Sequence, residues 1–249
     1  MTEQHLRVIH DEAQDGPTNM ARDETLLTRV GAGTSAPTLR TYMWSPPTLS
    51  LGYFQKYGDY EALDSPAGEL PVVRRQTGGG AILHDRELTY SIALPLDHPT
   101  VATGPNTLYE MAHDALIECL QSRGVRTHRE GETDGFGAGR GPFFCFASRH
   151  RLDVLVGDDK LASSSQRRTQ NAVLQHGSIV FEIRYDQQPA ATVRGATAME
   201  PDDLRRPFTA AFARRAGLSA VPGCWTEAEL ALAGQLIAKY AGPEWTRRV

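Results

Sequence analysis

The chain has 249 residues, of which 40% are hydrophobic and 22% are charged, as in an ordinary globular protein with a substantial core. The 26 basic and 30 acidic residues give a net charge of −4, which offers no electrostatic basis for binding nucleic acid or an anionic membrane. The sequence has no membrane-spanning apolar run and no signal-peptide pattern, and its three cysteines lack CxxC spacing. These features indicate a cytoplasmic protein without a cysteine zinc site.

The first third of the chain predicts one helix and several strands. Asn19 stands before two acidic residues that suit the positive end of a helix, so we expect a helix capped by Asn19. Residues 39–44 and 49–52 predict short strands. Residues 88–94 alternate apolar and polar side chains, which predicts a half-buried strand that ends at Pro95.

The middle of the chain contains the clearest helix. Apolar residues of 108–123 fall on one helical face, Thr107 and Glu110 match a capping box, and Gly124 follows the last turn. The glycine-rich segment 131–141 predicts a mobile loop.

The second half predicts a hairpin and two further helices. Residues 152–156 and 160–162 flank a Gly-Asp-Asp turn, and residues 174–182 contain another strand. Helices are expected over 207–216 and 227–240, and the second begins with a capping box.

This mixed order lacks regular βαβ alternation. It predicts an α+β fold with a mainly antiparallel sheet and flanking helices, in one domain over 1–249 with a helical C-terminal part from about 203.

Three consecutive glycines, Gly78, Gly79 and Gly80, follow the arginine pair Arg74 and Arg75. Their backbone N–H groups carry no Cβ in the way and could wrap a phosphate, an acyl carbonyl or an oxyanion. A tight turn or bulge between two strands is the alternative. The stretch matches neither a P-loop nor a dinucleotide-binding fingerprint.

Cys145 lies in the segment GPFFCFAS, where a buried structural cysteine is the common outcome. A nucleophilic role needs a nearby base or cation to make the thiolate, and Lys160 is a candidate because the hairpin could bring it back. Cys119 falls on the apolar helix face and is expected in the core, and Cys224 is expected to be incidental.

Lys160, His84 and His176 also have structural alternatives. A lysine that ends a tight turn is commonly solvated, and a histidine near a strand end is commonly a hydrogen-bonded structural residue. No histidine spacing indicates a metal site.

Several stretches together resemble the lipoate–protein ligase/octanoyltransferase family, relatives of biotin protein ligase. They occur in the family's order over almost the whole chain: NMARDETLL, LRTYMWSPPTLSLGYFQ, VVRRQTGGGAILHDRELTYSIALPL, GDDKLASSSQRR, LQHGSIVFE and KYAGPEW. The resemblance implies a fold related to the class II synthetase catalytic core. It also implies attachment of a lipoyl, octanoyl or biotinyl group to a lysine of a small carrier domain.

The resemblance further implies the roles of individual residues. The RRxTGGG segment would line an acyl tunnel and contact the acyl head, and the lysine of the family would be Lys160. The implied acyl-binding residues are Arg74, Arg75, Gly78, Gly79, Gly80, His84, His176 and Gly177.

Within this family the resemblance is nearest to the LipM-type octanoyltransferases, which carry a cysteine in a CF segment shortly before the lysine motif, as Cys145 does here. This implies transfer of octanoyl from acyl carrier protein, through Cys145, to a lysine of a lipoyl domain or the glycine-cleavage H protein. The reaction would need no cofactor and no metal. One departure is that Ser163, Ser164 and Ser165 replace the usual Gly-Ser-Ala, which narrows the space beside the acyl chain.

Three alternatives remain open from the sequence. An ATP-dependent lipoate or biotin ligase, which would use ATP and magnesium, shares the fold. An amidotransferase would move octanoyl between two carrier proteins through the same cysteine. A non-catalytic carrier-binding protein is favoured by Ser163 and Ser165 and disfavoured by Cys145 and Lys160.

Overall fold

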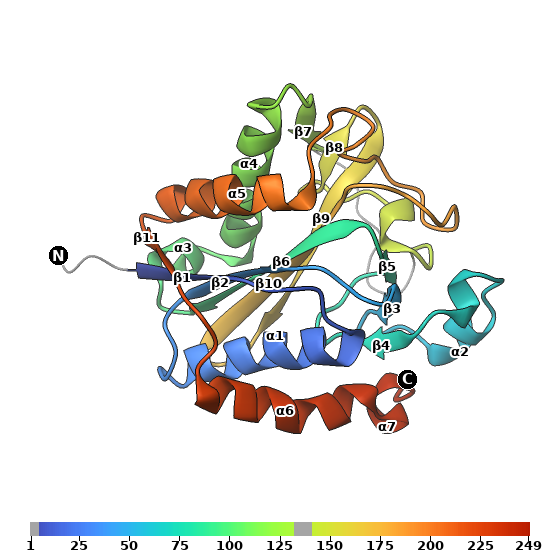
Figure 1. The fold of residues 1–249 in the computed structure, drawn as a ribbon, viewed down its shortest axis with the longest axis horizontal. Helices are drawn as coiled ribbons and strands as arrows, with labels where there is room; N and C mark the ends of the chain where they lie inside the picture. Colours follow the sequence, from blue (N-terminus) through green and yellow to red (C-terminus); the bar gives the residue numbers. More distant parts are fainter. Residues whose placement is uncertain (1–4, 132–140) are drawn as a thin grey trace.

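The computed structural model describes residues 5–131 and 141–249, and its mixed sheet with flanking helices confirms the predicted fold class (Figure 1). The predicted mobile loop 131–141 lies almost entirely outside these residues. The strands are β1 (His5–His10), β2 (Thr38–Tyr42), β3 (Thr48–Leu51), β4 (Val72–Arg74), β5 (Ile82–His84), β6 (Glu87–Pro95), β7 (Thr127–Arg129), β8 (Val154–Val156), β9 (Asp159–Arg168), β10 (Ala172–Val180) and β11 (Ser219–Pro222). The helices are α1 (Gly16–Gly31), α2 (Tyr57–Glu61), α3 (Pro99–Ala102), α4 (Pro105–Gln121), α5 (Pro201–Arg215), α6 (Glu227–Ala241) and α7 (Pro243–Thr246), with short 3₁₀ turns η1 (Ala67–Glu69) and η2 (Cys145–Ala147).

Two sheets organise the described part of the chain. The larger has eight strands in the order β11-β1-β2-β6-β10-β9-β8-β7, and the smaller has three in the order β4-β3-β5. β1 pairs in parallel with both β11 and β2, whereas the other pairings of the larger sheet are antiparallel. In the smaller sheet β3 pairs in parallel with β4 and antiparallel with β5.

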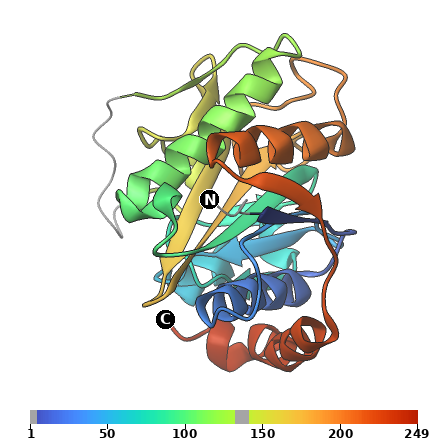
Figure 2. The same ribbon diagram turned by 90° about the vertical axis from the view of Figure 1, so that its left-hand side faces the viewer.

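Helices cover both faces of the larger sheet. Helices α4 and α5 lie on one face, α1 lies on the other, and α6 packs on the outer side of α1 (Figures 1 and 2). The main core joins Leu108, Ala112 and Leu116 of α4 to Phe208 and Phe212 of α5 and to the sheet. The spacing of the α4 residues places them on one helical face, which is the face that the sequence predicts to be buried.

Strand β6 is buried on both faces, which differs from the half-buried strand that the sequence predicts. Eight of its nine residues are buried, so the strand is a central one rather than the half-buried strand that the alternation of residues 88–94 predicts. Thr89, one of its polar members, is satisfied inside the protein by side-chain hydrogen bonds to Trp44 and Glu87 rather than by solvent.

Three predicted helix starts were wrong. Helix α1 begins earlier, with Asp15 as the N-cap accepting from the Thr18 backbone N–H, and Asn19 lies buried in its second turn. Helix α4 begins at Pro105 after Gly104, without the expected Thr107–Glu110 capping box. Helix α5 begins at Pro201, so Pro207 lies inside it. In each case a proline at the first turn starts the helix upstream of the predicted cap.

The C-terminal part from about 203 is largely helical and also contains the strand β11. β11 extends the larger sheet by pairing with β1, and α5 packs against α4. Helix α6 has the predicted Thr226–Glu229 capping box. The last third of the chain therefore completes the core rather than standing outside it.

Candidate functional site

The glycine segment packs against the backbone of the 3₁₀ turn η2, which contains Cys145. Ala81 N–H donates to the Phe143 carbonyl at 2.8 Å, and Cys145 N–H donates to the Ala81 carbonyl at 2.8 Å. A Cβ on Gly80 would lie 2.8 Å from the Cys145 nitrogen. The glycine is therefore required because the backbone of the cysteine packs there, and the acyl-chain contact that the resemblance implies stays a prediction.

Gly79 packs closely against Gly52, in a different segment of the chain. It has φ +90°, and its carbonyl oxygen would lie 1.9 Å from a Cβ on Gly52, so neither position accepts a side chain without a shift. The triplet forms a bend between β4 and β5, and Gly78 and Gly79 also border a pocket.

Cys145 and Lys160 lie together, as the hairpin predicts. Lys160 Nζ is 4.0 Å from Cys145 Sγ and donates to the Cys145 carbonyl at 2.8 Å. The lysine is not solvated, because only 3% of it is exposed and its ammonium pairs with the Asp153 carboxylate at 2.7 Å. The sequence did not identify Asp153, which stands just before β8.

A register shift explains how Lys160 and Ser163 reach the same side of β9. Val154 pairs with Ala162 and Leu155 pairs with Lys160, so Leu161 is an extra residue on β9. Side chains alternate along a strand, and one extra residue brings positions three apart to the same face.

The three serines that replace Gly-Ser-Ala have distinct partners. Ser163 Oγ donates to Asp153 Oδ1 at 2.8 Å and lies 3.6 Å from Cys145 Sγ. Ser164 Oγ contacts the Tyr90 hydroxyl at 2.5 Å, and Ser165 Oγ donates to the Gly78 carbonyl at 3.1 Å. These serines therefore connect β9 to Cys145, to the core and to the glycine segment.

His84 is held by a carboxylate on one side and a hydroxyl on the other. Its Nδ1 donates to Glu87 at 2.7 Å, because a carboxylate can only accept, and its Nε2 lies 2.8 Å from the Ser50 hydroxyl oxygen. The imidazole stacks on Trp44 with the ring centres 3.8 Å apart. This fixed ring forms one wall of the pocket.

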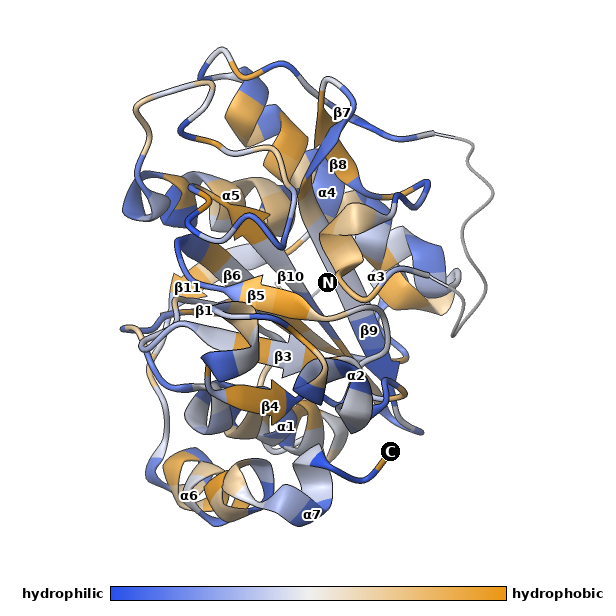
Figure 3. Cartoon of the chain, turned by 90° about the vertical axis from the view of Figure 1, so that its right-hand side faces the viewer, coloured by the Kyte–Doolittle hydropathy of each residue, from blue (hydrophilic) through white to orange (hydrophobic). Residues whose placement is uncertain are grey.

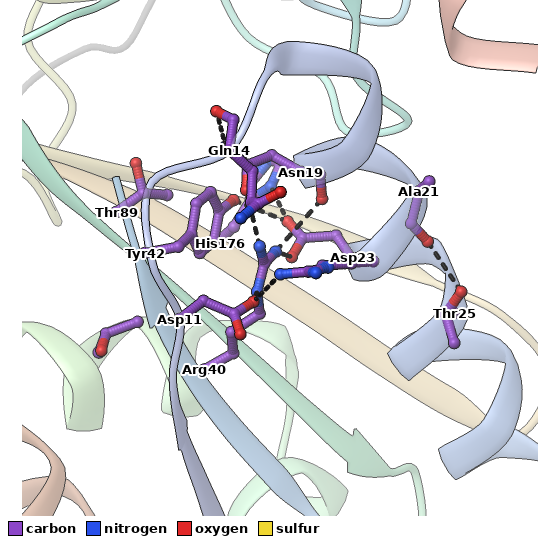
Figure 4. Close-up of polar contacts among 12 residues, drawn as sticks. Asp11, Gln14, Asn19, Ala21, Asp23, Thr25, Arg40, Tyr42, Thr89 and His176 are labelled. Carbon is purple, nitrogen blue, oxygen red and sulfur yellow. Dashed lines mark hydrogen bonds and ion pairs between the residues drawn. The ribbon is translucent and has the colours of Figure 1, made fainter. Parts of the chain in front are cut away.

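His176 is held in the same way by Asp23, a residue of α1 that the sequence did not single out (Figure 4). Its Nδ1 donates to Asp23 Oδ2 at 3.1 Å, and its Nε2 accepts from the Thr77 hydroxyl at 2.6 Å. Burial lowers the pKa of His176 although Asp23 opposes this, so the imidazole is neutral near pH 7. Arg40 completes the cluster through an ion pair with Asp23 at 2.9 Å.

The two arginines before the glycines have different surroundings. The Arg75 guanidinium binds the carbonyl oxygens of Ser50, Gly78 and Gly80, and no carboxylate in the described part of the chain pairs with it. Burial lowers the pKa of Arg75 to about 10, although the nearby Cys145 opposes this shift. Arg74 instead binds the carbonyl oxygens of Gly52, Gln55 and Thr246, so the structure does not bring it to the pocket.

The pocket connects these groups and has an empty volume of about 460 Å³, including its open mouth. Of the predicted binding residues it contains Arg75, Gly78, Gly79, His84, His176 and Gly177, and it also contains Cys145. Gly80 and Lys160 contact Cys145 from outside this lining, and Arg74 lies elsewhere. The remaining lining residues are Met20, Tyr42, Trp44, Ser50, Ile82, Thr89, Ser163, Ser164, Ser165 and Ser178.

Apolar side chains form part of the pocket lining. Met20, Trp44 and Ile82 line it, and Figure 3 shows β5, the strand of Ile82, coloured mainly as hydrophobic. Ile82 also packs with Phe146 and Val180 in a small cluster that Cys145 joins. A slender apolar group beside Cys145 therefore has a wall to bury against.

The described ranges, 5–131 and 141–249, contain neither a metal centre nor a membrane span. Within them, no three histidine, cysteine, aspartate or glutamate side chains gather where they could hold a metal ion. None of the helices described there is both long enough and apolar enough to cross a membrane.

Comparison with known proteins places this site in a family. Residues 15–206 match the model of the family described as the lipoyl protein ligase A/B catalytic domain. The chain belongs to this family. Octanoyltransferase LipM from Moorella thermoacetica is 34% identical over 97% of both chains. The protein of the same description from Kyrpidia tusciae is 34% identical over 98% of this chain and 99% of its own.

A solved structure of this lipoyl protein ligase fold agrees with the architecture. Lipoate–protein ligase A bound with ATP superposes with a TM-score of 0.78 over 99% of both chains at 21% identity. At that identity the likeness shows the shared fold, which confirms the fold that the resemblance implies.

Proposed function

We propose that this member of the lipoyl protein ligase A/B family is an octanoyltransferase of lipoate biosynthesis that carries the octanoyl group on Cys145. Relatives described as octanoyltransferases match nearly the full length of the chain. The observation that carries the proposal is the place of Cys145, which lines an apolar-walled pocket with the Lys160 ammonium 4.0 Å from its sulfur.

The first half of the reaction forms the acyl-enzyme. Cys145 Sγ bonds to the carbonyl carbon of octanoyl–acyl carrier protein, the carbon–sulfur bond to the phosphopantetheine arm breaks, and the carrier thiol leaves. The Lys160 ammonium stabilises by its charge the negative charge that develops on the sulfur, and Arg75 adds a second positive charge at the pocket. Backbone N–H groups of the glycine segment are suited to hold the carbonyl oxygen as it gains charge.

The second half transfers the acyl group. The amine of the target lysine, on a lipoyl domain or the glycine-cleavage H protein, attacks the Cys145 thioester to form an amide and release the cysteine. A thioester is already activated, so the proposed reaction draws on neither ATP nor a metal ion. Two half-reactions also let two large carrier proteins use one pocket in turn.

Intact mass spectrometry tests this function. The enzyme is mixed with octanoyl–acyl carrier protein without ATP, and a mass increase of one octanoyl group at Cys145 is expected. Cys145→Ala should abolish both the adduct and the transfer, whereas Cys224→Ser, a change at an exposed cysteine, should affect neither.

The other outcomes identify the alternatives. Acylation of the carrier domain only in the presence of free acid and ATP would identify a ligase. Loading of Cys145 only from an octanoylated H protein would identify an amidotransferase. A protein that binds the carriers but is acylated by no donor would be a carrier-binding protein.

A further inference from the structure

A closed ring of polar contacts surrounds the sulfur of Cys145. Ser163 Oγ lies 3.6 Å from Cys145 Sγ and donates to Asp153 Oδ1 at 2.8 Å. Asp153 Oδ2 pairs with Lys160 Nζ at 2.7 Å, and that ammonium lies 4.0 Å from the same sulfur. Cys145 is thus connected to one carboxylate by two routes.

The donors and acceptors of the ring give its two sides different chemistry. An ammonium has three N–H donors and no lone pair, so Lys160, held between Asp153 and the Cys145 carbonyl, acts as a cation. Ser163 has its only proton directed at Asp153, which leaves the lone pairs of its oxygen available to the thiol. The Ser163 side is therefore the one that can accept a proton from Cys145.

Burial isolates this pair from solvent. Asp153 is 3% exposed and Ser163 is 6% exposed, and the backbone N–H of His150 also donates to the Asp153 carboxylate at 2.7 Å. The family resemblance implies glycine at position 163. A buried serine between the nucleophile and a carboxylate is thus a feature of this chain that has no part in the acyl-enzyme chemistry described above.

The titratable groups around the pair come from several elements. Lys160 faces Asp153 from β9, Tyr109 and His113 face it from α4, and Arg75 faces Cys145 from the glycine segment. Burial lowers the pKa of His113 despite its hydrogen bond to the Leu152 carbonyl, so this imidazole is neutral near pH 7. Neutral His113 adds no charge to the ring.

We propose that Ser163 and Asp153 form a proton relay that serves Cys145, an inference that rests on the proposed acyl-enzyme. As Sγ bonds to the acyl carbon, the thiol proton moves to Ser163 Oγ while the serine's own proton moves to Asp153 Oδ1. The bond to the donor's sulfur breaks, and that thiolate takes the proton back along the same path. The carboxylate and the serine end this half-reaction unchanged.

The same relay serves the transfer to the target lysine. The attacking amine nitrogen forms a bond to the acyl carbon and loses one proton to Ser163 Oγ, while the serine proton again moves to Asp153. The carbon–Sγ bond breaks, and the proton returns to Cys145. Lys160 keeps its proton throughout and balances the charge on the sulfur.

The test follows the two half-reactions of the full-length enzyme separately. Octanoyl–acyl carrier protein is added alone to time the loading of Cys145 by mass spectrometry, and a lipoyl domain is then added to time the discharge. Ser163→Ala should slow both steps by roughly 10²- to 10⁴-fold near pH 7, the usual contribution of general acid–base catalysis. The deficit should shrink as pH rises, because hydroxide in solution then removes the proton.

A second variant and a matched control complete the design. Asp153→Asn should show the same deficit with the same pH dependence. If that variant does not fold because the Lys160 ammonium loses its partner, Ser163→Ala, which keeps the ion pair, decides alone. Ser35→Ala is the control, since Ser35 donates to Glu229, a carboxylate that pairs with Arg7 outside the pocket. It should load and discharge like the unchanged enzyme.

The possible results distinguish the relay from the proposed function. An enzyme whose Cys145 is never loaded overturns the acyl-enzyme itself. Normal loading and discharge in Ser163→Ala at every pH would overturn the relay and leave the acyl-enzyme standing. A deficit that stays the same at all pH values would also overturn it, because that behaviour indicates only altered packing.

Discussion

At the scale of single residues, Gly80 shows how one missing side chain positions Cys145, the proposed nucleophile. A Cβ on Gly80 would lie too close to the Cys145 backbone, at 2.8 Å from the Cys145 nitrogen and 3.0 Å from the Cys145 Cα. A Cβ on Gly78, two positions earlier, would meet no atom within 4 Å, and the Gly78 carbonyl accepts from Ser165 and Arg75. Gly78 and Gly80 are therefore under different steric constraints.

A pair of alanine substitutions separates these constraints. Gly80→Ala should push the Cys145 turn outward, lower the rate of octanoyl loading by at least about tenfold and destabilise the protein by about 1–3 kcal/mol, the usual cost of overpacking. Gly78→Ala has room for its methyl and should unfold at the same urea concentration as the unchanged protein. Single-turnover loading and urea denaturation measure both effects, and equal behaviour of the two variants would contradict this assignment.

Lys160 also has a structural role that a solvated turn lysine would not have. Lys160→Ala should abolish loading and also lower the free energy of unfolding by about 3–5 kcal/mol, because the buried Asp153 carboxylate would lose its cation. Lys56→Ala removes an exposed lysine and should leave stability unchanged. Chemical denaturation compares the two, and an equally stable Lys160→Ala protein would show that the ion pair adds nothing to the fold.

At the scale of elements, the start of α1 depends on two polar residues with different roles. Asp15 caps the helix, whereas Asn19 accepts from Arg40 at 2.6 Å and donates to the carbonyl oxygens of Gln14 and Met43 (Figure 4). Arg40 in turn pairs with Asp23, the partner of His176. The helix start therefore supports a pocket histidine through buried polar contacts.

Substitutions at these two positions should differ in cost. Asp15→Ala should destabilise the protein by about 1 kcal/mol, as expected for loss of an N-cap. Asn19→Ala should cost more, because each buried group left without a partner costs about 1–3 kcal/mol. Urea denaturation monitored by circular dichroism gives both values. A larger loss for Asp15→Ala than for Asn19→Ala would contradict the importance of the buried contacts of Asn19.

At the scale of the whole molecule, Glu229 links helix α6 to strand β1 through polar contacts. Its carboxylate accepts from Arg7 at 2.6 Å and from the Ser35 hydroxyl at 2.6 Å. Burial alone would raise the pKa of Glu229, but the hydrogen bonds from Arg7 and Ser35 lower it to about 2. The contact joins residues 222 positions apart, so it forms only in the folded chain.

This shifted pKa predicts how stability depends on pH. An unfolded glutamate has a pKa of about 4.3, so the folded protein holds its proton less tightly. The stabilisation by Glu229 is therefore fully present above pH about 4.3 and disappears as pH falls through about 2. The difference in unfolding free energy between the unchanged protein and Glu229→Gln should be constant near neutral pH and shrink in acid. A difference that is independent of pH would contradict the ionic origin of this contact.

The sequence by itself determined several local elements and the family of the protein. Alternation, turn residues and the Thr226–Glu229 capping box are local signals, and they predicted the β8–β9 hairpin and helix α6. The order of the motifs predicted the family, and the spacing of Cys145 and Lys160 predicted their meeting. These signals depend on residues close in the chain or on motifs of a known family.

Only the tertiary structure decided which groups act on one another. The extra residue in β9 turns Ser163 and Lys160 to the same side of the strand. No feature of the amino-acid sequence indicates that register shift. Asp153, Asp23 and Glu87 became partners of site residues only when separate strands and helices packed together. The role of a buried polar group depends on its partners, which can be distant in sequence. A buried charge needs an opposite charge or a hydrogen-bond partner, and only the fold decides which residue supplies it.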